Sequence, residues 1–327
     1  MLTLLDFAKL SLHVYKNPAE IKKYLGNYVK IDHPILPRTL FQSSKGSGIY
    51  EVMLDRHIQN HHAQTHSSDN SGFYASFYVK KQHNKITDAV IAIRGTDNFL
   101  NDEVDIKSWW RAVMVDGHAS LPKHYNGMAL SFYHKARWFC KDHDIPTNHF
   151  FVTGHSLGGA LAGLLPAHDG CLIRAVTFNA PGISSMKQVK HGHNMVINFR
   201  SAFDFVSAID EAIGNLFSIH VPEQEDEAKK AFEIEYEHKE DSWSRLDIIE
   251  DLVEIEEFMV SVLPQHKMRN LYQAIEKRCH HKAGENAYFD PYGTFEHYER
   301  ELILPAPFGP TLYPGKNEED IRRGRQQ

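Results

Sequence analysis

The chain has 327 residues with a formal net charge of -6, and 42% of them are hydrophobic and 24% charged. This composition is typical of an ordinary soluble globular protein, and the length fits one large α/β domain or two smaller ones. The negative charge gives no reason to expect a nucleic-acid partner, and no apolar run is long enough for a membrane span.

The first fifteen residues are expected to form a helix, because apolar residues recur there at helical spacing: Leu2, Leu5, Leu12 and Val14. A basic n-region and a cleavage site are missing, so we do not expect a signal peptide. A cytoplasmic location is the default expectation, and export without a cleaved signal peptide stays open. A short helix over 18–25 and mostly loop over 32–69 are expected next.

Two strands over 72–81 and 86–94 are expected to form a hairpin, because both are rich in β-branched and aromatic residues and a turn sequence separates them. The second strand runs directly into Gly95 and Thr96. Residues 97–123 show little regular pattern, and the adjacent Trp109 and Trp110 either meet an apolar substrate or anchor this loop. A helix over 124–143 follows, with an apolar side formed by Met128, Phe132, Ala136 and Phe139.

A glycine-flanked serine follows the apolar stretch 149–152. Gly154, Ser156 and Gly158 fit the G-x-S-x-G pattern of a nucleophile elbow, a strained strand-to-helix turn that presents the serine hydroxyl. The bare pattern arises often by chance. The preceding apolar strand and the small residues of the following helix favour the elbow over a glycine-rich helix cap.

Two further strands are expected over 171–178 and 194–200. Strands that alternate with helices indicate a mostly parallel sheet, whose catalytic loops lie at the carboxyl ends of the strands. Asp204 lies at such an end and is the candidate acidic residue. Asp210 is the alternative candidate. The explanation without a catalytic role is that Asp204 only caps a turn.

Residues 223–262 differ in composition from the rest, with fifteen acidic and four basic side chains, about -11 in all, which leaves the remainder near +5. We interpret this segment as a helical insertion, a candidate cap, within a single domain that spans 1–327. A break at 264–266 precedes a helix over 267–279. Residues 305–327 are expected to form a surface tail.

The cysteines and histidines indicate neither disulfides nor a metal site. Three scattered cysteines (Cys140, Cys171 and Cys279) are expected to be reduced thiols. The 22 histidines include a cluster at 57–66, but none of them has the spacing of a zinc site.

Residues 153–165 resemble the nucleophile elbow of the class 3 (fungal-type) lipases, a branch of the α/β-hydrolases. The resemblance spans roughly residues 70–280 and includes the segments 93–96, 177–181, 204–206 and 265–272. It implies an α/β-hydrolase fold, in which helices flank a mostly parallel central sheet.

By this resemblance Ser156 attacks the ester carbonyl, His266 carries the proton and Asp204 orients the imidazole. The oxyanion would be bound by Thr96, through its N–H and its hydroxyl, and by the N–H of Leu157. No cofactor is implied. The implied substrate is a lipid acyl ester, either a glyceride or a glycerophospholipid, and transient contact with a membrane surface is expected. Members of the family carry a mobile lid or a substrate-facing loop where this chain has 97–123. The insertion 223–262, identified from its composition, is the other candidate for a lid.

The histidine is chosen by comparison among those that follow Asp204: His220, His238, His266, His280, His281 and His297. His266 lies just after Pro264 at a helix break, as in the similar class 3 segment, although that family often has aspartate where this chain has Gln265. His297, in a turn-rich segment, stays the alternative general base.

Three other functions use the same fold. A water-soluble carboxylesterase or thioesterase would use the same residues and differ in acyl-chain preference, and a peptidase is a further alternative. A catalytically silent binding protein would keep the fold without the activity.

Overall fold

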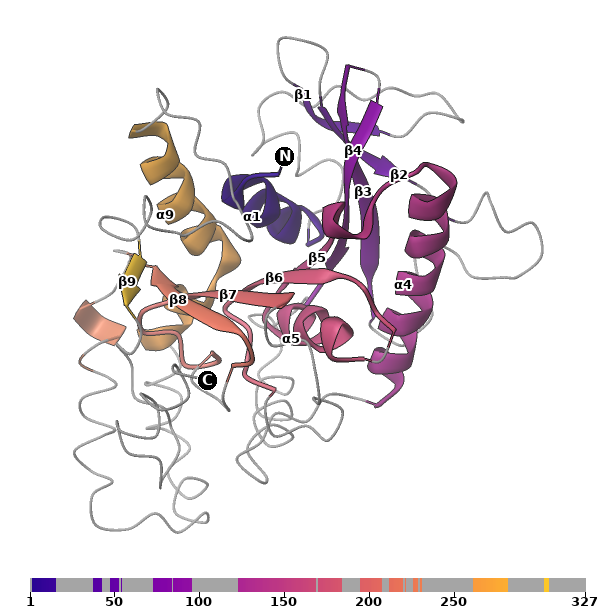
Figure 1. The fold of residues 1–327 in the computed structure, drawn as a ribbon. Coiled ribbons are helices and arrows are strands. Elements are labelled where there is room, and N and C mark those ends of the chain that lie inside the picture. The colour runs from indigo at the N-terminus through magenta and orange to yellow at the C-terminus, as the bar shows by residue number, and fades with distance from the viewer. Residues whose placement is uncertain are drawn as a thin grey trace.

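The computed structural model describes residues 2–15, 38–42, 48–52, 54, 73–83, 85–95, 123–168, 170–183, 195–207, 212–219, 221, 226–228, 230, 261–281 and 303–305. These residues are built around a nine-stranded sheet whose strands follow one another in sequence order (Figure 1). The strands are β1 (Arg38–Gln42), β2 (Gly48–Val52), β3 (Ala75–Gln82), β4 (Lys85–Ile93), β5 (Phe150–His155), β6 (Arg174–Phe178), β7 (Val196–Ser201), β8 (Asn215–Ile219) and β9 (Ile303–Pro305).

The sheet is parallel at its centre and antiparallel at both ends. Strands β4 to β8 pair in parallel, whereas β1 to β4 and the β8–β9 pair are antiparallel. The expectation of a mostly parallel sheet is therefore correct for the five central strands and wrong for the sheet as a whole. The five carboxyl ends of β4 to β8 meet along one edge.

Helices cover both faces of the sheet. The helices are α1 (Leu4–His13), α4 (Lys123–Asp142), α5 (Leu157–Leu164) and α9 (Met268–His281), and the single-turn 3-10 helices are η2 (Thr147–His149) and η3 (Leu165–Ala167). One apolar core lies between the sheet and the pair α4 and α5, and a second lies between the sheet and the pair α1 and α9. None of the helices in the described ranges is long and apolar enough to cross a membrane.

Alternation along the strands fills both cores. In β5, Phe150 and Val152 face α4 and α5, while Phe151 faces α1 and α9. All six residues of β5 are buried, as expected for a central parallel strand that is covered on both sides. The arrangement is a three-layer α/β structure that holds β5 rigidly in its middle.

Several expected elements are confirmed with small changes at their ends. The hairpin forms as β3 and β4, the first helix as α1, and the helix over 124–143 as α4. A capping box between Thr3 and Asp6 fixes the start of α1. The buried side of α4 is centred on Ala129 and Tyr133, with Met128 and Phe132 only partly buried.

Two local predictions are wrong and one is incomplete. The stretch 32–69 is expected to be mostly loop, and its described residues include two strands: β2 pairs antiparallel with β3, and β1 with β2. Five-residue strands carry too short a pattern to be read from sequence. Pro305 belongs to β9, and not to the tail. Helical backbone continues through 261–266 and is interrupted at Lys267 alone.

Other predictions fall on residues outside those the structure describes. They concern the short helix over 18–25, the loop over 97–122, nearly all of the acidic segment 223–262, and the tail after Pro305. The single-domain organisation therefore stays a prediction.

The core on the α1 side holds a buried histidine, and this makes stability depend on pH. Burial lowers the pKa of His13 from its ordinary 6.5 to about 4. The folded state therefore favours the neutral ring, and this contribution is complete above about pH 6.5 and is lost as the pH falls toward 4. The loss amounts to on the order of 3 kcal/mol.

Urea unfolding at several pH values between 7.5 and 4 measures this dependence. The control is His13→Asn, whose amide can occupy the position of the ring Nδ1, which lies 2.8 Å from the Tyr78 hydroxyl. We expect the free energy of unfolding of this variant to fall less steeply below pH 6.5 than that of the wild type. Equal slopes would contradict the assignment.

Candidate active site

The candidate site is centred on Ser156, at the junction of β5 and α5. Its backbone has φ 57° and ψ -130°, a left-handed conformation that costs a non-glycine residue on the order of 1–3 kcal/mol. The Ser156 N–H donates to the Phe178 carbonyl at 3.0 Å, and its carbonyl accepts from the Ala160 N–H at 3.0 Å. The strain is thus held between a neighbouring strand and the first turn of α5, as a nucleophile elbow requires.

Two glycines allow this turn to close. A Cβ at position 154 would overlap the backbone of Gly158, and a Cβ at position 158 would overlap the Ile93 carbonyl at the end of β4. The beginning of α5 therefore packs directly on the loop that follows β4. Leu157 is the first residue of α5, so its N–H is among those at the positive end of the helix.

Asp204 follows the end of β7, His266 is the last residue of the 261–266 helical segment, and their side chains form a buried pair. His266 Nδ1 lies 2.7 Å from Asp204 Oδ1, and both side chains are almost completely buried. Burial alone would raise the pKa of Asp204, but attraction to His266 and hydrogen bonds from His266 and Ser207 lower it overall. An ionised Asp204 accepts a hydrogen bond from the Nδ1–H group, which leaves Nε2 as the unprotonated nitrogen of a neutral His266.

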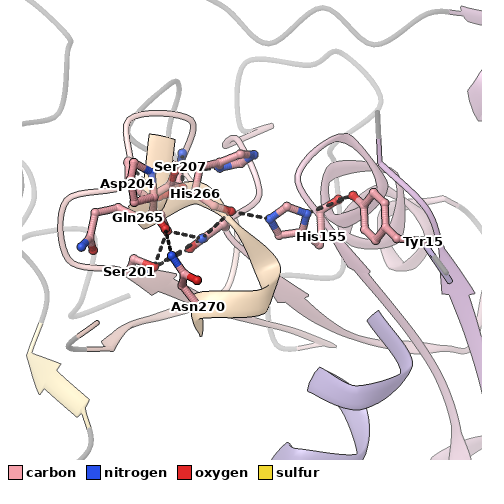
Figure 2. A network of polar contacts seen from close by, with 10 residues as sticks. Tyr15, His155, Ser201, Asp204, Ser207, Gln265, His266 and Asn270 are labelled. Atoms are coloured by element: carbon pink, nitrogen blue, oxygen red, sulfur yellow. Dashed lines mark hydrogen bonds and ion pairs between the residues drawn. The ribbon is translucent and has the colours of Figure 1, made fainter. Parts of the chain in front are cut away.

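Side chains from other segments donate hydrogen bonds to the backbone carbonyls at and just before His266 (Figure 2). The Asn179 amide donates to the carbonyls of Gln265 at 2.9 Å and His266 at 3.1 Å. The Ser201 hydroxyl donates to the Gln265 carbonyl at 2.6 Å. Asn270 donates to the Pro264 carbonyl at 2.9 Å. These bonds satisfy the carbonyls that a helix end leaves without partners, and they fix the position of His266.

His155 connects this segment to the elbow. Its Nε2 lies 2.7 Å from the His266 carbonyl, and the two rings are 4.8 Å apart between centroids. The residue just before Ser156 therefore contacts the backbone of the residue that pairs with Asp204. The structure brings Ser156, Leu157, Asp204 and His266 into one region at the carboxyl edge of the parallel strands.

The remaining predicted site residues lie outside the described part of the chain: Thr96, Asp210 and His297. Gly95, immediately before Thr96, is described and follows the β4 end that packs on α5. Gln265, which stands where the similar family often has aspartate, is buried and donates to the Val221 carbonyl at 2.9 Å.

Sequence reasoning assigned no role to Tyr15, His155, Asn179 or Ser201. The signal for two of them was present, because His155 lies inside the elbow motif and Asn179 inside the segment 177–181. For Tyr15 and Ser201 the sequence carries no local pattern.

The described residues offer no alternative metal or thiol chemistry. Within them, no group of three or more His, Cys, Asp or Glu side chains is arranged to hold a metal ion. Cys140 and Cys171 are free and buried. Burial raises the pKa of Cys140 to about 12 and also raises that of Cys171, so both are protonated thiols rather than nucleophilic thiolates.

One known protein family has a model that matches the chain. Residues 7–233 match the family described as "Phospholipase-like: Tle-like phospholipase domain". This match contains Ser156 and Asp204 and ends before His266. No curated protein matches the chain.

Two lipases of known structure are similar to the chain. One is the extracellular lipase LipA from Serratia marcescens, with 19% identity and a TM-score of 0.31 over 53% of this chain and 27% of that chain. The other is M37 lipase, with 14% identity and a TM-score of 0.34 over 85% of this chain and 90% of that chain. The chain thus spans about a quarter of the LipA chain.

The described residues form an α/β fold, and the family model that matches the chain is described as phospholipase-like. The match over 7–233 covers more than half of the chain. The chain therefore belongs to the Tle-like phospholipase domain family.

Proposed function

We propose that the protein hydrolyses acyl esters of glycerophospholipids through a Ser156–His266–Asp204 triad and an acyl-enzyme intermediate. The single observation that carries this proposal is the buried 2.7 Å bond between His266 and Asp204, on a segment that His155 joins to the strained serine. The family supplies the lipid class, and a glyceride is the alternative substrate.

In this mechanism, His266 Nε2 takes the proton of the Ser156 hydroxyl as its oxygen attacks the ester carbonyl. His266 then returns that proton to the leaving alcohol, and a water molecule releases the fatty acid by the reverse sequence. Asp204, kept ionised by its surroundings, stabilises the imidazolium that forms in both steps. The reaction of the ester needs no cofactor.

The oxyanion is bound by the N–H of Leu157 and by Thr96. The packing of Gly158 on the end of β4 supports this assignment, because it puts the loop before Thr96 beside the start of α5. Donors fixed in this way stabilise the charge that develops on the carbonyl oxygen.

Thr96→Val is expected to lower kcat about a hundred-fold, because it removes the hydroxyl donor and keeps nearly the same shape. Steady-state kinetics on a nitrophenyl ester measure this effect. An unchanged kcat would mean that only the backbone N–H of residue 96 acts on the oxyanion.

The finer features of the proposal come from the resemblance to class 3 lipases within the α/β-hydrolases. Residues 97–123 or the acidic insertion 223–262 would act as the lid, and transient contact with a membrane surface would deliver the lipid. The insertion lies in sequence between Asp204 and His266.

Phospholipid vesicles and a graded series of nitrophenyl esters test the substrate class. A phospholipase releases fatty acid from vesicles in a Ser156-dependent manner and prefers long acyl chains. Turnover of short esters alone would identify a water-soluble esterase instead. Failure of a fluorophosphonate probe to label the protein would identify a catalytically silent member of the fold.

A further inference from the structure

A chain of three hydrogen bonds joins the loop after β4 to the His266 segment. The Gly95 N–H donates to the Tyr15 hydroxyl at 2.9 Å. The Tyr15 hydroxyl lies 2.9 Å from His155 Nδ1, and His155 Nε2 lies 2.7 Å from the His266 carbonyl. The four residues come from distant parts of the sequence and meet below the elbow; Figure 2 shows the links from Tyr15 through His155 to His266.

The acceptors assign the His155 tautomer. A carbonyl oxygen only accepts, so His155 Nε2 must carry the proton of its hydrogen bond to the His266 carbonyl. The neutral ring then has an unprotonated Nδ1, which accepts a hydrogen bond from the Tyr15 hydroxyl at 2.9 Å. The same hydroxyl also lies 3.3 Å from the His155 carbonyl, the longer of its two acceptor contacts, and its oxygen accepts from the Gly95 N–H.

The His155 ring stays neutral over the pH range of ester hydrolysis. Burial, together with repulsion from His266, lowers the pKa of His155 to about 3. The His155 ring faces the Asp204 carboxylate and the His266 imidazole. Tyr15 packs edge-to-face against it, with the ring centroids 5.6 Å apart. A protonated ring would lose its acceptor for Tyr15 and break the chain.

The hydrogen-bonded chain ends at two parts of the site whose separation must stay constant for catalysis. Gly95 immediately precedes Thr96, the proposed oxyanion donor. His266 is the proposed general base, and its own ring is oriented by Asp204 while its backbone is held by His155 and Asn179. A displacement of about 1 Å between such groups can lower the rate about a hundred-fold.

We propose that Tyr15 and His155 are positioning residues, which hold the oxyanion loop and the general-base segment at a fixed separation through this hydrogen-bonded chain. Neither side chain takes part in the reaction itself. This role rests on the proposed serine hydrolase function, and it gives Tyr15, two residues after the end of α1, a positioning role.

The protein contains a matched control for this role. His13 and Tyr78 form a second tyrosine–histidine pair, with Nδ1 2.8 Å from the hydroxyl and the rings edge-to-face at 5.7 Å; Tyr78 is fully buried, whereas Tyr15 is partly buried. This pair lies in the core on the α1 side and touches none of the proposed catalytic residues. Tyr15→Phe and Tyr78→Phe therefore delete the same hydroxyl from pairs of nearly the same geometry.

The experiment compares kcat, KM and melting temperature of the wild type, Tyr15→Phe, Tyr78→Phe and Ser156→Ala on one nitrophenyl ester. We expect Tyr15→Phe to lower kcat about ten-fold to a hundred-fold with KM within about two-fold of the wild type. Tyr78→Phe should lower the melting temperature by a similar amount and leave kcat within about two-fold.

Equal kcat values for the two phenylalanine variants would overturn the positioning role, provided that Ser156→Ala is inactive. A wild type that fails to hydrolyse the ester, or a Ser156→Ala variant as active as the wild type, would overturn the serine hydrolase function and the positioning role with it. The Ser156→Ala arm therefore separates the two failures.

Two substitutions of His155 test the ends of the chain separately. His155→Gln keeps an amide N–H near the position of Nε2 and so keeps a donor for His266, whereas His155→Asn keeps polar atoms only near Nδ1, beside Tyr15. We expect His155→Asn to lower kcat more than His155→Gln. Tyr15→Phe and His155→Gln combined should lower kcat by less than the product of their separate effects; fully multiplicative effects would overturn the chain as one unit.

Discussion

Replacing Ser156 with alanine is expected to lower kcat for ester hydrolysis about a million-fold, as happens when the nucleophile of a working triad is removed. The other members of the site cannot substitute for it, because they hold and move the proton but form no bond to the acyl group. The fold should persist, since the Ser156 side chain makes no capping hydrogen bond to α5 and alanine occupies nearly the same volume.

Fatty-acid release from phospholipid vesicles and labelling by a fluorophosphonate probe measure this loss. The control is Ser76→Ala, which truncates another buried serine, in β3 and away from the elbow, and should keep full activity. If Ser156→Ala keeps more than a few per cent of wild-type activity, the proposed nucleophile is wrong.

Replacing His266 is expected to be as damaging as replacing Ser156, because a triad loses most of its effect when any proton-transferring member is absent. His266→Ala would also leave the buried Asp204 carboxylate without its partner, which threatens folding. His266→Asn avoids this problem, because its amide can donate to Asp204 from near the position of Nδ1 while the Nε2 base is gone. We expect kcat of both variants to fall about as far as that of Ser156→Ala.

His297, the alternative general base, is the comparison for His266. His297→Ala should stay within about ten-fold of the wild type in the same vesicle assay. The reverse ranking, with His297→Ala inactive and His266→Asn active, would transfer the general base to His297 and leave the assignments of Ser156 and Leu157 unchanged. Circular dichroism on each variant separates lost folding from lost chemistry.

The central features of the fold could be predicted from sequence because their causes are local. Gly154, Ser156 and Gly158 determine the turn between β5 and α5 by steric exclusion, and this exclusion depends on residues only a few positions apart. The hairpin of β3 and β4 is likewise encoded by alternating patterns and the turn between them. Asp204 is a candidate from sequence because the carboxyl ends of parallel strands meet at one edge.

The rest could not be predicted because it depends on contacts between distant segments. Tyr15 lies 140 positions before His155, and nothing in its own neighbourhood distinguishes it from any tyrosine at a helix end. The strand β2 gains its structure from pairing on β3, and β1 from pairing on β2. Proline at 264 suggests a helix break there, but helical backbone continues to His266, and the carbonyls of Pro264 and Gln265 accept from Asn179, Ser201 and Asn270.

The pairing of α1 with α9 has a consequence for how the chain is made. The two helices pack together on one face of the sheet (Figure 1), yet α1 ends at His13 and α9 begins at Met268. At about 5–20 residues per second, a ribosome needs roughly 10–50 s to synthesise the intervening residues. During this interval the apolar face that includes Tyr78, Phe151 and Phe199 lacks half of its cover, so it is exposed to aggregation and to chaperones. The elbow can form in this period while His266 has yet to be translated, so under the proposed mechanism the nascent chain lacks its general base.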